Sequence, residues 1–98
     1  MISIQKDLAL VVTKPTAWEA LEAIAAEPDY SMTQRDVFMK VPISPGVIIK
    51  DLLNWQSVKI LEVMPDPADK RAVRYKINRG KYEKAKQLIT LINEILEG

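Results

Sequence analysis

The order of apolar and polar residues changes from a helical to an alternating pattern near residue 58. Before this point, apolar residues recur every three or four positions in three stretches, which predicts three helices. After it, two alternating runs separated by a turn predict a hairpin, and helical spacing then returns. The predicted helices cover residues 16–27, about nine residues after Ser31, Pro45 to about Gln56, and 81–97; the predicted strands cover 58–64 and 72–77.

Polar residues and prolines mark the starts of these helices. Thr16 and Ser31 each stand three positions before a glutamate or glutamine, the spacing of a capping box, so each is expected to cap a helix. Ser44 is expected to cap the third helix, because Pro45 suits the first helical position. Residues 2–12 are apolar and fit either a short strand or the start of a helix.

The third helix has more apolar positions than a single core-facing stripe needs, so we expect it to be well packed. Its packed positions are predicted to be Ile48, Ile49, Leu52, Leu53 and Trp55, and its outward positions Ser44, Val47, Lys50, Asp51 and Asn54. Both tryptophans, Trp18 and Trp55, lie in apolar helical rows and are expected in the core rather than in a base-stacking site.

The apolar band of the last helix is wider than one core-facing stripe requires. We therefore expect part of it to pair with a second copy of the chain across a two-fold axis. The residues assigned to this homodimer interface are Leu88, Leu91, Ile92, Ile95 and Leu96.

The composition predicts one folded domain, residues 1–98, with 48% hydrophobic and 28% charged residues. Cysteine and histidine are absent, which excludes disulfides, thiol nucleophiles and imidazole bases. We therefore expect no enzyme activity, no bound metal and no cofactor. No apolar run approaches the length of a membrane span and the start does not resemble a secretion signal, so a cytoplasmic protein without membrane contact is expected.

Positive charge is concentrated in one segment of the chain. Residues 70–86 hold eight basic residues and Glu83, a net charge of +7 in a chain whose net charge is +1. In the second predicted strand, Arg74 and Lys76 alternate with apolar residues and so share one face. Such a segment fits either an ordinary solvated surface or a site for a phosphate backbone.

Three helices with a tight break between the second and third, followed by a hairpin, are typical of a winged helix-turn-helix. Within this order, residues 66–74 (DPADKRAVR) resemble the wing of the MarR family of transcriptional regulators, which has a D-P-x-D-(R/K)-R pattern. Asn78, Arg79 and Gly80 resemble the family's exit from the wing, and the resemblance covers residues 15–82. The predicted fold is an α+β winged helix-turn-helix of three helices and a two-stranded wing, with a C-terminal dimerisation helix.

The resemblance implies a homodimeric protein that binds double-stranded DNA and represses or activates transcription. Asp69 would orient the wing arginine through an ion pair, because a carboxylate itself is repelled by phosphate. The recognition helix would enter the major groove while the wing meets the backbone or minor groove, and the start of the preceding helix commonly faces the backbone. The residues assigned to DNA are Thr33, Gln34, Ser44, Gly46, Val47, Lys50, Lys70, Arg71 and Arg74.

Three features of the chain depart from this family. The family has glycine where the recognition helix turns into the wing, whereas this chain has Ser57, Val58, Lys59 and Ile60 there. Its members are longer, with dimer-forming helices before and after the domain, so no small-molecule effector is assigned. Lys50 is also offset by the neighbouring Asp51, which predicts modest base reading.

Two other functions fit the same pattern. A winged-helix adaptor would use the hairpin and the apolar last helix to hold protein partners without touching DNA. A plasmid- or virus-type replication or partition protein would share the DNA chemistry and differ only in its context. The sequence predicts neither the operator nor the regulated gene.

Overall fold

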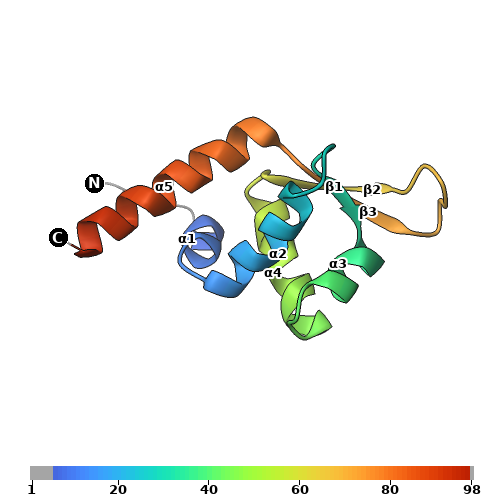
Figure 1. The fold of residues 1–98 in the computed structure, drawn as a ribbon, viewed down its shortest axis with the longest axis horizontal. Coiled ribbons are helices and arrows are strands. Elements are labelled where there is room, and N and C mark those ends of the chain that lie inside the picture. The colour runs from blue at the N-terminus through green and yellow to red at the C-terminus, as the bar shows by residue number, and fades with distance from the viewer. Residues whose placement is uncertain (1–5, 98) are drawn as a thin grey trace.

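The computed structural model describes residues 6–97 of the chain. In the described part, five helices accompany one three-stranded antiparallel sheet of strand order β1-β3-β2 (Figure 1). The helices are α1 (Lys6–Val12), α2 (Pro15–Ala25), α3 (Gln34–Lys40), α4 (Pro45–Ser57) and α5 (Arg79–Glu97). The strands are β1 (Ser31–Thr33), β2 (Leu61–Pro65) and β3 (Val73–Ile77).

The core lies between α2, α4 and the inner face of the sheet, and the two tryptophans occupy its centre. Trp55 is fully buried, and its Nε1 donates to the carbonyl of Ala17 at 2.9 Å. The Nε1 of Trp18 donates to the carbonyl of Val12 at 3.0 Å, and the two rings meet edge to face at 5.0 Å. Both indoles thus keep a polar partner while buried, as the prediction of a core position requires.

The predicted two-stranded wing forms as β2 and β3, but Ser31 belongs to a third strand of the same sheet and does not cap a helix. Ser31 pairs with Lys76 in register, and its hydroxyl donates to Asp29 at 2.7 Å. The cap of α3 is Thr33, whose Oγ1 accepts from the amide of Asp36 at 3.2 Å. The capping-box spacing predicted the wrong cap residue. Threonine is also a good cap residue, and Thr33, two positions later, takes this place.

The predicted cap at Thr16 is also wrong, and the reason is a buried carboxylate. Helix α2 begins one residue earlier at Pro15, with Lys14 at the cap position. The Thr16 hydroxyl donates instead to Asp51 at 3.1 Å, and the Lys14 ammonium lies 2.7 Å from the other oxygen of Asp51. Asp51 is 1% exposed, so the prediction that it faces outward fails: its two partners on the α1–α2 side draw it inward.

The first wing strand starts later than predicted because the chain makes a tight turn after α4. Lys59 has a φ of 66°, in the left-handed region, and the amide of Ile60 donates to the carbonyl of Trp55 at 3.1 Å. This turn and its hydrogen bond end α4, so the pairing of β2 with β3 begins only at Leu61.

The first and last described helices, α1 and α5, lie against each other at one side of the molecule (Figure 1). Residues 6–12, which the sequence left open between strand and helix, form α1; residues 2–5 lie outside the described part. Helix α5 starts at Arg79, two residues before the predicted start, and buries Tyr82 and Ala85 while its second half extends beyond the body (Figure 1). Across the described residues, no helix has the length and apolar character that a membrane crossing needs.

Candidate nucleic-acid interface

Helix α4 turns one row of four residues away from the core. This outward row consists of Gly46, Lys50, Leu53 and Ser57. These positions are spaced by three or four residues and so lie on one side of the helix, opposite the buried Ile48, Leu52 and Trp55. Leu53 is 55% exposed and the neighbouring Ile49 is 39% exposed, so the prediction that both are packed is wrong.

Lys50 is the cation of this row, and its charge is not offset as predicted. The adjacent Asp51 points into the protein, where it meets Lys14 and Thr16. The turn of a helix places consecutive residues about 100° apart, which is why neighbours in sequence can face the core and the solvent. The positive charge of Lys50 is therefore available on the exposed side of α4.

At the start of α4, Ser44 stands at the predicted cap position, but its side chain makes no capping hydrogen bond. Its carbonyl accepts the amide of Ile48 at 3.1 Å. Gly46 follows in the first turn, and a methyl group added to it would meet nothing within 4 Å. The surface around the first turn of α4 is consequently open to an approaching molecule.

The start of α3 is tied to the sheet. The Gln34 side chain donates to the Tyr75 hydroxyl at 2.8 Å, and Thr33 is engaged as the cap. Both residues are half-buried, while the adjacent Arg35 is exposed. Sequence reasoning did not select Arg35, although its place in the first turn of this helix puts a guanidinium beside the other candidates.

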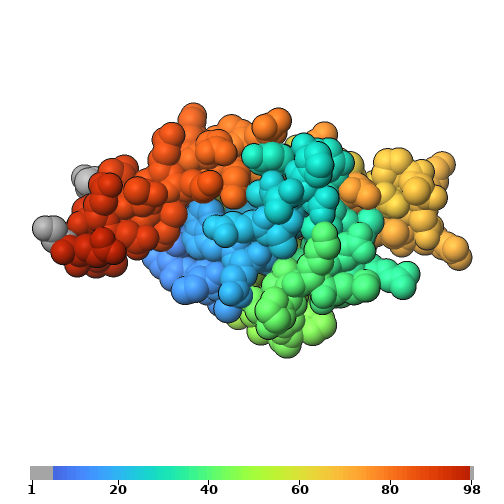
Figure 2. Space-filling view, in the orientation of Figure 1, coloured from blue at the N-terminus to red at the C-terminus, as the bar shows by residue number. Residues whose placement is uncertain are grey.

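The wing loop, residues 66–72 between β2 and β3, is closed by its own hydrogen bonds. The amide of Asp66 donates to the carbonyl of Ala72 at 3.0 Å, and the amide of Arg71 donates to Asp69 Oδ1 at 3.0 Å. Arg71 Nε lies 3.6 Å from the same oxygen of Asp69, and the Arg71 side chain is 94% exposed. Lys70 is exposed beside it. Lys70 and Arg71 are thus held in solvent, and the segment that carries the wing loop forms one end of the molecule (Figure 2).

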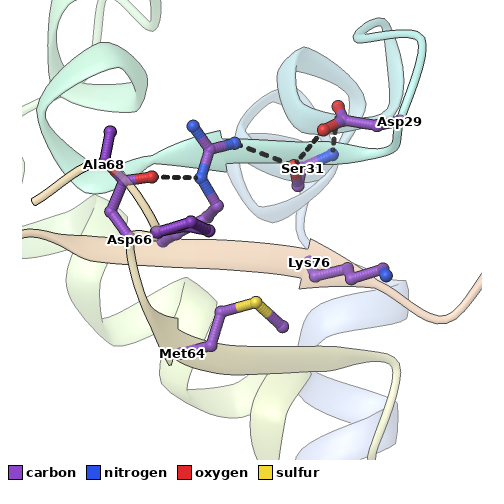
Figure 3. A pocket seen from close by; sticks show the side chains of 8 residues that line it. Asp29, Ser31, Met64, Asp66, Ala68 and Lys76 are labelled. Carbon is purple, nitrogen blue, oxygen red and sulfur yellow. Dashed lines mark hydrogen bonds and ion pairs between the residues drawn. The ribbon is translucent and has the colours of Figure 1, made fainter. Parts of the chain in front are cut away.

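Arg74 is separated from Lys70 and Arg71, with which the sequence analysis grouped it. Its Nε donates to Asp66 Oδ1 at 2.8 Å and its Nη1 donates to the Ser31 hydroxyl at 2.8 Å, so its guanidinium connects the wing loop to β1 (Figure 3). Only 26% of the side chain is exposed. By strand alternation it shares the outer face of the sheet with Lys76, as predicted, and with Met64.

The same network reaches Asp29. The Ser31 hydroxyl donates to this carboxyl, and that hydrogen bond lowers the pKa of Asp29 below its ordinary value. Asp66, Ser31 and Asp29 were not among the predicted site residues. Asp66 stands in the wing motif, but Ser31, which accepts from the same guanidinium of Arg74, lies in a strand that the sequence pattern did not reveal.

A hollow of about 330 Å³ runs between the start of α3 and the wing loop. It brings together residues from two parts of the chain that are more than thirty positions apart: Thr33, Gln34, Arg35, Asp66, Asp69, Arg71, Ala72 and Val73. Two exposed guanidinium groups, those of Arg35 and Arg71, belong to this hollow, while Asp66 is occupied by Arg74. An anion that enters this hollow would meet Arg35 and Arg71, with Asp69 as a competing carboxylate 3.6 Å from Arg71 Nε.

The five residues assigned to a homodimer interface fall into two groups. Leu88 and Ile92 are half-buried against the core of their own chain. The other three lie on the second half of α5 and are exposed: Leu91 by 56%, Ile95 by 78% and Leu96 by 78%. The structure therefore leaves apolar side chains exposed on α5, whose C-terminal part forms the end of the molecule opposite the wing (Figure 2). Within residues 6–97, no group of three or more His, Cys, Asp or Glu side chains is arranged to hold a metal ion.

Neither a protein-family model nor a curated protein matches the sequence. The structure is similar to BpsR from Bordetella bronchiseptica (TM-score 0.68, 17% identity, 95% of this chain and 70% of BpsR). It is also similar to a cysteine-to-serine mutant of MarR from E. coli in complex with operator DNA (TM-score 0.68, 21% identity, 94% and 64%). PcaV from Streptomyces coelicolor gives a TM-score of 0.68 at 19% identity over 95% and 72% of the two chains. The protein has a MarR-type winged-helix fold.

The expectation of this fold from the wing motif is thereby confirmed, over a chain that spans about two thirds of the length of the E. coli MarR structure. One departure from the MarR pattern now has a structural explanation. Where the family has glycine between the recognition helix and the wing, Lys59 adopts the left-handed conformation that glycine adopts freely.

Proposed function

We propose that the protein is a transcriptional regulator that binds double-stranded DNA sequence-specifically in the cytoplasm, with α4 in the major groove and the wing loop on the backbone or minor groove. In this proposal Lys50, Gly46 and Val47 face the bases, and Ser44, Thr33 and Gln34 lie near phosphates. Lys70 and Arg71 of the wing loop contribute most of the attraction to the polyanion.

The hollow shared by α3 and the wing loop is the observation that carries the proposal. Arg35 and Arg71 come from separate elements, both are exposed, and both line this one concavity. A phosphate backbone that follows the hollow would meet both cations at once. The fold adds support, because one of its matched structures, the E. coli MarR mutant, is a complex with operator DNA.

Arg74 has a different part in this proposal. Because its guanidinium is bound by Asp66 and Ser31, it fixes the base of the wing loop and contributes to the positive field from the outer face of the sheet. Asp69 keeps the predicted role of orienting an arginine, with Arg71 as the partner. No small-molecule effector is part of the proposal.

We further propose that two copies associate through α5, with Leu91, Ile95 and Leu96 at the centre of the contact and Leu88 and Ile92 at its edge. Such a dimer would present two α4 helices to successive major grooves about 34 Å apart. Selection of bound duplexes from a random pool would then yield inverted repeats.

Retention on immobilised duplex DNA at increasing salt tests the proposal. We expect strong retention at low salt that falls steeply, because each phosphate contact releases counterions. Arg71→Ala should weaken binding to every duplex and reduce the slope of log K against log salt by about one unit. Lys86→Ala, which removes one charge on the polar side of α5, is the matched control and should bind as the unaltered protein does.

Absence of retention at low salt would contradict the proposal and favour the adaptor, in which the wing and α5 hold proteins. Retention with an unchanged slope in Arg71→Ala would place the DNA elsewhere on the surface. Replication or partition proteins share the DNA chemistry, so the genes next to the selected sites in a genome would separate those contexts from transcription.

A further inference from the structure

The exposed face of α4 is apolar on both sides of a single cation. Val47 precedes Lys50 by three residues and Leu53 follows it by three, so each lies about 60° to one side of Lys50 around the helix. Val47 is 36% exposed and Leu53 is 55% exposed. Gly46 adds no side chain to this face.

Hydrogen-bonding side chains are scarce on the same face. Of the other polar residues of α4, Asp51 is buried, Asn54 and Gln56 are half-buried, and the hydroxyl of Ser57 donates to Asp7 of α1. Lys50 is therefore the one side chain of α4 that projects a hydrogen-bond donor from the centre of its exposed face.

The major groove offers two kinds of sequence signal to such a surface. Lysine pairs with the O6 and N7 acceptors of guanine, and apolar side chains contact the C5 methyl group of thymine. Arginine, asparagine and glutamine, which read bases by paired hydrogen bonds, do not occupy the outward row of α4. The chemistry of the helix thus fits methyl groups on either side of a guanine.

We propose that Val47 and Leu53 determine the sequence specificity of the protein by contacting thymine methyl groups that flank the base pair contacted by Lys50. The inference rests on the proposed DNA binding and specifies which duplexes are preferred. Six residues of helix separate Val47 from Leu53 by about 9 Å along the axis, or about two to three base-pair steps of about 3.4 Å.

Charge favours DNA over a protein as the occupant of this face. A protein-docking surface is generally depleted of charge at its centre, whereas Lys50 stands at the centre here. The exposed cations Arg35 of α3 and Lys70 and Arg71 of the wing loop also attract a polyanion to the protein. The exposed apolar side chains on either side of Lys50 gain a favourable contact when thymine methyls cover them.

A uracil scan tests the inference directly. Duplexes retained from a random pool are resynthesised with uracil in place of thymine at one position at a time, which removes the C5 methyl and preserves base pairing. We expect the affinity of the unaltered protein to fall about fourfold at each contacted position. Burial of one methyl group contributes about 0.8 kcal/mol, and a change of about 1.4 kcal/mol corresponds to a tenfold change in affinity.

The variants Val47→Ala and Leu53→Ala should each lose the uracil effect at one position and keep it at the other. Met39→Ala, which shortens an exposed apolar side chain on α3, is the matched control and should keep both effects. Duplexes that bind equally well with uracil at every position would overturn the inference and leave DNA binding intact. If no duplex is retained at all, the proposed function and the inference fall together.

Discussion

Arg74 of β3 and Asp66 of the wing loop form a hydrogen-bonded ion pair, with Nε donating to Oδ1 at 2.8 Å. The pair is partly shielded, since 26% of the Arg74 side chain and 11% of the Asp66 side chain are exposed. The Asp69–Arg71 pair in the same loop is far more exposed and longer. The two pairs are therefore expected to differ in their contribution to stability.

Asp66→Ala should destabilise the fold by about 1–2 kcal/mol, because it leaves a partly buried guanidinium with Ser31 alone. Urea denaturation measures this loss. Asp69→Ala is the matched comparison and should cost less, while the loop becomes more sensitive to limited proteolysis because the Arg71 amide loses its acceptor. Equal losses from the two variants would show that the shielded pair does not secure the wing.

Gly46→Ala should separate folding from DNA binding. A methyl group at this position meets nothing within 4 Å, so the free protein should fold with unchanged or slightly higher stability, since alanine loses less backbone entropy than glycine. Binding to duplex DNA should weaken if the first turn of α4 approaches the DNA as proposed. Thermal unfolding and duplex retention, measured on the same variant, give the two readouts. If the variant binds duplex DNA as well as the unaltered protein does, the DNA does not contact α4 at Gly46.

Ile95→Lys should convert a dimer into a monomer without unfolding the chain. The Ile95 side chain is 78% exposed in the single chain, so the substitution removes little burial there, but a lysine at the centre of an apolar contact would be desolvated. Sedimentation at micromolar concentration measures the change. Thr90→Lys on the polar side of α5 is the control and should leave the mass unchanged. If the unaltered protein already sediments as a monomer, the dimer proposal is wrong.

The sequence predicted those parts of the fold that depend on local pattern. Helical spacing located both ends of α2, α4 and α5 to within about two residues, and alternation placed Arg74 and Lys76 on one face of β3. The wing motif identified the fold class, which similarity of structure then confirmed. These features are encoded in neighbouring residues, so one sequence is sufficient to reveal them.

Features that depend on distant residues were missed. Asp51 appeared to be an outward charge, but Lys14 and Thr16, more than thirty positions earlier, pair with it inside the protein. Ser31 appeared to be a helix cap, but it pairs with β3, a strand more than forty positions later. The same limit hid Arg35, which lies beside Arg71 only once the sheet has formed.

Lys59→Gly should stabilise the protein, because position 59 has a φ of 66° and a side chain with a Cβ is strained there. Relief of that strain exceeds the extra entropy of glycine in the unfolded chain, so we expect a gain of about 0.5–1 kcal/mol in the free energy of unfolding. Lys59 is exposed and the described structure gives it no side-chain hydrogen bond, so loss of the side chain should cost little. Chemical denaturation of Lys59→Gly beside Lys59→Ala, which keeps the Cβ, isolates the backbone effect. A gain of the same size in Lys59→Ala would assign the change to the charge of Lys59 and not to its conformation.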